Sequence, residues 1–386
     1  MRLGLLCVAL MVGTPASGAM GQSVALPPGP SAPSASPKVL TAGDPAPALD
    51  IATWVKGDSI KSFEKGKAYV VEFWATWCAP CRATIPHLTA MQAKFAKQGV
   101  TFIGVSVDQG GDALSKVRSF VDNMGDKMGY TVALDAGTTG SSYLGASGVS
   151  GIPHAFVVDK NGKMVWHGNP AMPVDGMELI VSEVADGTFD LKKNEERTAK
   201  FAELDSKFGE AQKNGKWEEA ETTLDQIEKI RPDLSHILAA THYGVIANGR
   251  KDMPAAMAFA RKAIDNESKG DPEQLLPLLD RVAGTPDLSA KDREFLAGLA
   301  QKVVDQTKGK VPAALSILGE TLASVGKFDE GIAATQKAVD AAQEEMEKRY
   351  YAGRLTEMKA KAAKATQTPP TPPAGDAPKT DAPKGP

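Results

Sequence analysis

Cysteine is scarce in this sequence: its 386 residues contain only Cys7, Cys78 and Cys81. A small domain stapled by several disulfides needs more cysteines, so the sequence excludes that class of protein. Positive charge is not in excess either, because 44 basic residues face 47 acidic ones and the formal net charge is −3. Charge therefore gives no reason to expect binding to nucleic acid or to an anionic membrane surface.

Long apolar runs are also rare, and no segment after the first residues approaches transmembrane length. The run at residues 3–12 follows Arg2, is too short to span a bilayer, and is followed by small residues up to Ala19. This order predicts a signal peptide over residues 1–19 that takes Cys7 with it when cleaved. A retained, uncleaved anchor is the alternative. We expect an exported protein, periplasmic or otherwise extracytoplasmic, with two cysteines in the mature chain.

The composition of the remaining chain changes at three places, which suggests two folded domains. Residues 20–40 and 365–386 are rich in Pro, Ala and other residues that bury little apolar surface, so both segments are predicted to be disordered. Between them, residues 41–190 alternate strand-like and helix-like patterns, whereas residues 195–364 are alanine-rich and helical throughout. A chain of this length exceeds what one hydrophobic core usually serves.

The pattern of residues 41–190 predicts a mixed α/β domain, a sheet covered by helices on both faces. An Asn161-Gly162 pair between two apolar runs signals a hairpin near the end of the domain. The predicted strands are 69–74, 100–107, 130–134, 155–159 and 164–167, and the predicted helices are 80–98, 113–124 and 174–185.

Residues 195–364 are self-similar at two distant places. The segment 215–220, Gly-Lys-Trp-Glu-Glu-Ala, returns as Gly-Lys-Phe-Asp-Glu-Gly at 326–331, and each is followed by apolar residues at helical spacing. This resembles the tetratricopeptide repeat, in which small residues let two antiparallel helices approach closely. We therefore expect a second, all-α helical-repeat domain, with an irregular helical bundle as the alternative.

The motif that carries chemistry is Cys78-Ala79-Pro80-Cys81, which follows a predicted buried strand and opens a predicted helix. A sulfur at a helix N-terminus meets unpaired N–H groups and the positive end of the helix dipole, which stabilise a thiolate. Cys81 lies one turn further on, close enough to form a disulfide with Cys78. Pro80 suits the first turn because no hydrogen bond is lost there.

Other uses of two nearby cysteines fit less well. A zinc site needs a second pair of ligands, and there is no second such motif; His236 and His242 are six apart, the wrong spacing for one helical face. Haem attachment needs His after the second cysteine, where Arg82 stands. A structural disulfide across so short a loop contributes little stability. Thiol-disulfide redox chemistry is the favoured interpretation, with no cofactor and no metal.

The segment from Val71 to Arg82 resembles the active-site segment of the thioredoxin fold, and is most similar to the extracytoplasmic TlpA/ResA-like thioredoxins of the redoxin (AhpC/TSA-type) superfamily. The sequence Gly151-Ile152-Pro153 before a strand resembles that family's cis-proline site. Residues 108–143 resemble the strand and helix that the family inserts. The resemblance covers about residues 41–190 and implies an α/β thioredoxin fold.

The resemblance implies roles for four residues. Cys78 would be the attacking cysteine and Cys81 the resolving one, the two forming the redox-active disulfide. Pro153 would shape the substrate groove and keep metals from the thiols. Glu72 would be a buried acid that exchanges a proton with the resolving thiol. The alternative for Glu72 is a carboxylate that faces solvent.

The substrate groove is expected to include Trp77, Pro80 and Ile152. The residue type at position 152 departs from that of thioredoxin itself and borders the thiols. His154 is interpreted as a packed or solvent-facing side chain, with a titrating group near the thiols as the alternative, and His167 is interpreted as structural.

We therefore predict an exported thiol-disulfide oxidoreductase, and favour a reductase because Ala79 and Pro80 carry no charge. Its partners would be protein disulfide or dithiol substrates, a membrane electron donor or acceptor, and a protein bound by the helical repeats. One alternative is a thiol peroxidase of the same superfamily, although Ala75 and Val71 stand where that chemistry needs Thr and Pro. The other is a non-catalytic scaffold built on the repeats.

Overall fold

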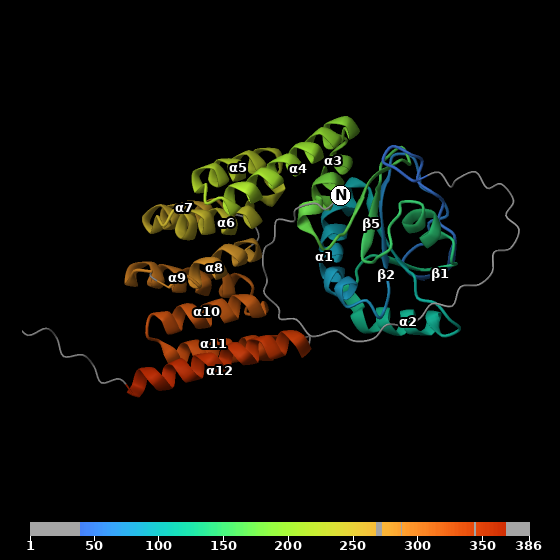
Figure 1. Ribbon diagram of the computed structural model, residues 1–386. Coiled ribbons are helices and arrows are strands. Elements are labelled where there is room, and N and C mark those ends of the chain that lie inside the picture. Colours follow the sequence, from blue (N-terminus) through green and yellow to red (C-terminus); the bar gives the residue numbers. More distant parts are fainter. Residues whose placement is uncertain (1–38, 268–271, 287, 343–344, 368–386) are drawn as a thin grey trace, which may run out of the picture. The chain divides into compact units, whose positions relative to one another are not determined.

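The computed structural model describes residues 39–267, 272–286, 288–342 and 345–367 (Figure 1). They form two compact units, one of residues up to Gly209 with Gln226–Leu234, the other of Glu210–Asp225 and the chain from Ser235 onward. The predicted signal peptide with Cys7, nearly all of the linker and most of the C-terminal tail lie outside the described residues. Within the described ranges, no helix combines the length and apolar character needed to cross a bilayer.

The first unit is built on a six-stranded mixed sheet with strand order β1-β4-β3-β2-β5-β6. Neighbouring strands β2, β3 and β4 are parallel, and β1, β5 and β6 are antiparallel to their neighbours. All seven residues of β2 are buried, which fits its central place. The strands are β1 (Ile51–Lys56), β2 (Ala68–Trp74), β3 (Val100–Ser106), β4 (Thr131–Asp135), β5 (His154–Val158) and β6 (Met164–Gly168).

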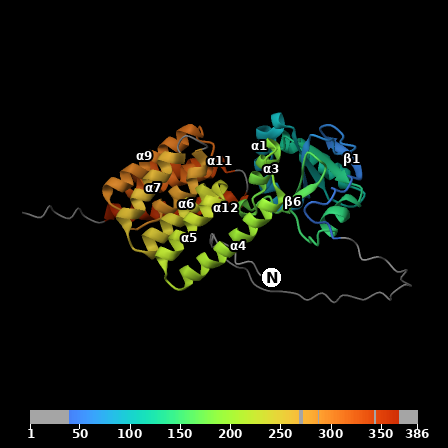
Figure 2. The ribbon, with the colours of Figure 1, turned by 90° about the horizontal axis from the view of Figure 1, so that it is seen from above.

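Helices α1 (Ala79–Phe95), α2 (Ala113–Met124) and α3 (Met177–Asp186) pack on one face of this sheet, where they share a core with Trp74, Phe102 and Val157. Figures 1 and 2 show α1 and α3 side by side on that face. The second face is covered by the chain between Leu40 and Phe63 and by a π-helical turn, Ser141–Gly145. Helical segments thus lie on both faces, but the second face has only a short one. This is the expected thioredoxin-type fold.

Strand β1 is absent from the predicted elements. It pairs with β4 at the edge of the sheet, its register shifts twice, and five of its six residues are half-buried. Such a strand has no clean alternation of apolar and polar residues. The burial pattern of an edge strand therefore explains why the sequence did not reveal it.

Two predicted segment boundaries differ from the structure. Leu40, placed in the disordered linker, is buried, and its N–H donates to the Ala146 carbonyl at 2.9 Å. At the other end, helix α12 continues to Gln367, into the segment predicted to be a disordered tail. The reason is local: the last turns are rich in Ala and Lys, which are strong helix formers, and the prolines begin only after them.

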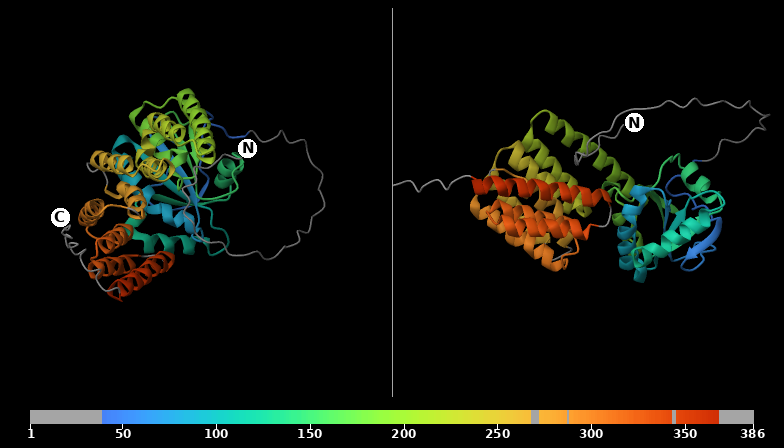
Figure 3. Two further views of the ribbon diagram at one scale, coloured as in Figure 1. Left: turned by 60° about the vertical axis from the view of Figure 1, so that its left-hand side comes forward. Right: turned by 90° about the horizontal axis from the view of Figure 1, so that it is seen from below.

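The rest of the described chain is helical. The helices are α4 (Leu191–Lys213), α5 (Trp217–Ile230), α6 (Ser235–Gly244), a π-helical segment Val245–Gly249, α7 (Met253–Glu267), α8 (Leu276–Ala283), α9 (Ala290–Gln306), α10 (Pro312–Ser324), α11 (Phe328–Ala341) and α12 (Glu345–Gln367). Short 3-10 helices are Ala96–Gln98, Gly125–Lys127, Pro173–Asp175, Pro232–Leu234 and Pro272–Leu275. In the second unit, the helices α6 to α12 are stacked in space in the order in which they occur in the chain (Figure 3).

Two glycines allow a close contact between α10 and α11 in the second unit. A Cβ on Gly319 would lie 2.8 Å from the Gly331 carbonyl oxygen, and one on Gly331 would lie 2.6 Å from the Gly319 oxygen. Both are distances that real Cβ atoms do not reach. The two backbones therefore touch through residues without side chains, in the segment that the sequence marks as a repeat.

Candidate active site

Cys78 and Cys81 lie where β2 ends and α1 begins, and they form a disulfide. Cys78 is the N-cap residue of α1, and its Sγ accepts the Cys81 N–H at 3.2 Å. Cys78 is 5% exposed and Cys81 is fully buried. Of the two cysteines, the one at the helix N-terminus is therefore the more exposed.

The loop before Cys78 is held by a buried carboxylate. Asp108 accepts hydrogen bonds from the Thr76 N–H at 2.9 Å, the Thr76 hydroxyl at 2.7 Å and the Ser106 hydroxyl at 2.8 Å. Strands β2 and β3 are parallel neighbours, so the residues that follow them meet at the same edge of the sheet. Sequence analysis missed Asp108, although an Asp directly after a predicted parallel strand was a usable signal.

The segment Ile152-Pro153 lies against the disulfide. The peptide bond between the two residues is cis, and the Ile152 carbonyl oxygen lies 3.8 Å from the Cys78 Sγ. Pro153 is buried and Ile152 half-buried. The antiparallel pairing of β5 with β2 places this segment, with His154 opposite Phe73.

Two side chains next to the cysteines in the chain, one aromatic and one a proline ring, are exposed to solvent. Trp77 is 69% exposed, and Pro80 is also exposed. A large apolar side chain in water next to a reactive pair is a feature of protein contact surfaces. Of the expected groove residues, Trp77 and Pro80 are thus exposed next to Cys78 in the chain, and the Ile152 carbonyl lies beside the Cys78 sulfur.

Glu72 is buried, not solvent-facing. Its side chain is on the fully buried strand β2 and is 1% exposed. Burial raises its pKa from 4.5 to about 8, because the charged carboxylate loses its hydration. Neither carboxyl oxygen has a hydrogen-bond partner among the described residues. At neutral pH such a group holds a proton that it can give up or take back.

His154 and His167 form a pair that the sequence did not reveal. Their Nε2 and Nδ1 atoms lie 3.0 Å apart, and the His167 ring stacks on Phe156. Burial and, second, the charge of His167 lower the pKa of His154 to about 4, and burial lowers that of His167. They are 13 residues apart, on the two strands of the hairpin, so only the register β5–β6 could have predicted the contact.

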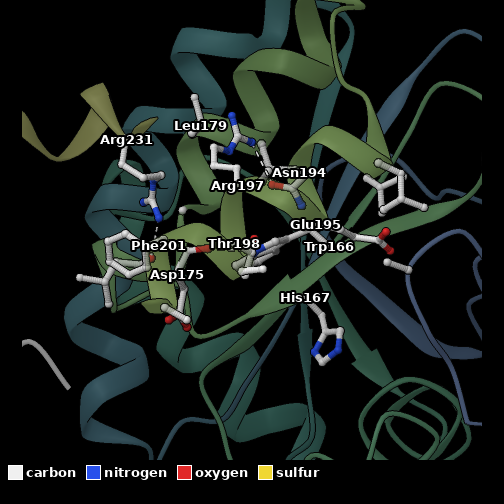
Figure 4. A pocket seen from close by; sticks show the side chains of 18 of the residues that line it. Trp166, His167, Asp175, Leu179, Asn194, Glu195, Arg197, Thr198, Phe201 and Arg231 are labelled. Carbon is white, nitrogen blue, oxygen red and sulfur yellow. Dashed lines mark hydrogen bonds between the residues drawn. The ribbon is translucent and has the colours of Figure 1, made fainter. Parts of the chain in front are cut away.

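A cavity of about 770 Å³ lies elsewhere in the first unit, between β6, α3 and α4 (Figure 4). Trp166, Leu179 and Phe201 give it a largely apolar wall, and the Arg231 guanidinium stacks over the Phe201 ring. Neither cysteine lines it. The cavity and the disulfide are therefore separate features.

The sequence of the first unit is similar to that of a protein family and of several known proteins. Residues 42–167 match the model of the AhpC/TSA family. The chain is 30% identical over 158 residues to "Protein FixW" of Rhizobium leguminosarum. This match covers 39% of this chain and 68% of that protein. It is 36% identical over 101 residues to "Thiol-disulfide oxidoreductase ResA" of Bacillus thuringiensis (strain Al Hakam), covering 26% of this chain and 54% of that protein.

The chain thus spans about two thirds of FixW and about half of ResA. Among solved structures, a "thiol:disulfide interchange protein, thioredoxin family protein" of Chlorobium tepidum TLS is 31% identical, with 39% of this chain and 99% of that chain covered and a TM-score of 0.32.

Proposed function

Since this chain belongs to the AhpC/TSA family, we propose that its first unit is a thiol-disulfide oxidoreductase whose redox-active pair is Cys78 and Cys81. The observation that carries this proposal is the disulfide at the N-terminus of α1, with the Ile152 carbonyl beside its outer sulfur. The name of the ResA relatives supports it.

The reaction begins with the pair in its dithiol form. The Cys78 thiolate, stabilised by the N–H groups at the start of α1, attacks one sulfur of a substrate disulfide. A new bond joins Cys78 to the substrate, the substrate S–S bond breaks, and the departing sulfur takes a proton. The Cys81 thiolate then attacks the Cys78 sulfur and releases the second substrate thiol. Two electrons have passed to the substrate, and the disulfide has formed.

Glu72 serves as the base for the second attack. Cys81 is buried, so its proton cannot pass directly to solvent, and a buried carboxylate with a pKa of about 8 can exchange protons near neutral pH. In the reverse direction the same group returns the proton to Cys81. Pro153, Ile152, Trp77 and Pro80 form the groove that holds the substrate backbone.

We further propose the reductase direction. The two residues between the cysteines, Ala79 and Pro80, bring no charge that would favour the thiolate of a strong oxidant. A membrane electron donor would then return the disulfide to the dithiol. The chain would be exported after loss of residues 1–19, and the helical repeats of the second unit would bind a protein partner and bring it to the cysteines.

Reduction of insulin disulfides by the mature protein, with dithiothreitol as the electron source, tests the activity. We expect reduction by the wild type, and none above background by Cys78→Ser. Equal rates for the two proteins would contradict the proposal. If Cys81→Ser consumed hydrogen peroxide faster than buffer without protein, the result would instead indicate a peroxidase.

A further inference from the structure

Three buried side chains with polar atoms lie on the face of the sheet that α1 covers. Glu72 and Trp74 are two residues apart on β2 and so point to the same face. The strand register places Glu72 opposite Gly104, and Gly104 opposite Val132, two residues after Tyr130. Glu72, Trp74 and Tyr130 therefore belong to one face. Their exposed fractions are 1%, 0% and 4%.

Gly104 leaves space for two of these side chains, Tyr130 and Trp74. A Cβ at position 104 would lie 2.9 Å from the Tyr130 Cε2 and 3.1 Å from the Trp74 Nε1. The tyrosine ring and the indole nitrogen thus lie directly over Gly104, which is the strand neighbour of Glu72. A larger residue would hold both rings away from the carboxyl group.

The hydrogen-bonding capacities of these groups are complementary. Both Glu72 carboxyl oxygens, the Trp74 Nε1 and the Tyr130 hydroxyl are buried without a hydrogen-bond partner in the part of the chain that the structure describes. An indole N–H only donates, a phenol hydroxyl can donate, and an ionised carboxylate only accepts. Unpartnered buried polar atoms are rare in folded proteins, so four of them on one face of the sheet call for a cause.

We propose that Trp74 and Tyr130 are the hydrogen-bond donors that hold Glu72 in its ionised form while it takes the proton of Cys81. They are positioning residues, because they act on Glu72 and not on the substrate. This inference rests on the proposed function, in which Glu72 is the base for Cys81.

The charges around Glu72 agree with this assignment. Burial is the cause of its raised pKa, with no charged side chain contributing among the described residues. Burial and then the Glu72 charge keep the pKa of Tyr130 well above 10, so Tyr130 retains its proton and stays a donor. In the core cluster of this face the titratable side chains are Tyr130, before β4, and the two cysteines of the disulfide, Cys78 and Cys81; β3 adds the apolar Phe102 and Gly104.

Tyr130→Phe tests the proposal, because it removes one hydroxyl and keeps the ring. We would titrate the Glu72 carboxyl carbon by NMR in the disulfide form of the full chain, with labelled glutamate and Glu72→Gln to assign the signal. Loss of the donor should disfavour the charged form and raise the Glu72 pKa by roughly half a unit or more, about a threefold change in the ionised fraction.

Tyr143→Phe is the matched control. Tyr143 is also fully buried, but on the other face of the sheet, and its hydroxyl donates to the Pro47 carbonyl at 2.7 Å. Its removal costs a hydrogen bond and should leave the Glu72 titration unchanged. A shift in Tyr130→Phe alone supports the proposal. No shift in Tyr130→Phe, or equal shifts in both variants, overturns it.

Gly104→Ala provides a second route if Tyr130→Phe does not fold. The added methyl group displaces the Tyr130 ring and the Trp74 indole without removing a polar atom, so it should also raise the Glu72 pKa; an unchanged titration would refute the donor role. The titration needs no turnover. A wild type without insulin reductase activity would therefore refute the proposed function, while the NMR comparison still decides whether Trp74 and Tyr130 serve Glu72.

Discussion

The Ile152 carbonyl oxygen and the Cys78 sulfur lie 3.8 Å apart, although 74 residues separate them in the chain. The antiparallel pairing of β5 with β2 brings them together, since both residues stand at the same end of these strands. The Cys78 sulfur therefore lies next to a backbone carbonyl and close in the fold to the buried Pro153. In the proposed function, this segment forms one side of the substrate groove.

Cys81→Ser should trap the reaction at its midpoint. Cys78 would still attack the substrate, but no second thiol would release it, so a covalent complex with the substrate should accumulate. Non-reducing electrophoresis and mass spectrometry of the mature variant with a peptide disulfide would detect it. Cys78→Ser is the control and should form much less complex. A larger yield from Cys78→Ser would show that the attacking residue is Cys81.

Glu72→Gln should make the fold more stable, and by more as the pH rises. The Glu72 pKa is about 8 in the fold and 4.5 as its ordinary value, so the stability of the wild type is full below pH 4.5 and is lost as pH rises toward 8. At about 1.4 kcal/mol per pKa unit, the difference reaches at most about 5 kcal/mol.

Guanidinium unfolding of the disulfide forms between pH 5 and pH 9 measures that difference. The exposed Glu64→Gln, which removes a surface ion pair with Lys67, serves as control and should change the free energy of unfolding by less than about 1 kcal/mol over this range. If the Glu72→Gln difference were constant with pH, the raised pKa would be wrong.

Asp108→Asn should loosen the loop before Cys78. The amide group would turn a donor toward hydroxyl and N–H groups that now donate to Asp108, and a buried unpaired group costs about 1–3 kcal/mol. We expect a lower Tm and slower insulin reduction. Asp112→Asn changes an exposed ion pair with Lys116 and should match the wild type. Equal effects of the two substitutions would contradict the role of Asp108.

His154, paired with His167, should take up a proton only at a pH below the usual range for histidine. The His154 pKa is lowered to about 4, so its contribution to stability is intact above pH 6.5 and is lost as pH falls toward 4. Proton NMR of the imidazole Cε1–H signals would follow this, with His154→Gln to assign them. The same variant should lose less stability between pH 6.5 and pH 4. Titration of His154 near pH 6.5 would contradict the pair as described.

Gly319→Ala should destabilise the second unit, whereas Gly298→Ala should not. Both are interior helical positions, but a Cβ on Gly319 would lie only 2.8 Å from the Gly331 carbonyl oxygen, and nothing lies within 4 Å of one on Gly298. Overpacking costs about 1–3 kcal/mol, and Ala gains about 1 kcal/mol over Gly in an open helix. Thermal unfolding followed by circular dichroism compares them. Similar Tm values would refute the close helix contact.

Sequence patterns predicted most elements of the first unit, because its central strands are continuous apolar runs and α1 begins directly after Cys78, with Pro80 in its first turn. They failed where burial is partial, as in β1 (Ile51–Lys56), or where only tertiary contact defines the feature. The same division holds at the site. The cysteine pair was readable from its spacing, and the role expected for Glu72 came from the resemblance of its segment to a known family. Asp108 was missed although it directly follows a predicted strand, because its role depends on hydrogen bonds to a residue that follows the neighbouring strand.

The helical unit shows the same limit. The segments 215–220 and 326–331 contain the first residues of α5 and α11, so the repeated pattern does mark helix starts. Whether the whole unit follows a tetratricopeptide arrangement stays a prediction, and the partner it binds stays a proposal.

The reduction potential of the Cys78–Cys81 pair in the mature protein tests the central claim most directly. Equilibration with glutathione or dithiothreitol buffers, followed by thiol alkylation and mass spectrometry, measures it. We predict a reversible two-electron couple near the thioredoxin value of about −270 mV, as a reductase requires. A couple near about −120 mV would reverse the direction of electron flow. The absence of any reversible couple would contradict the account as a whole.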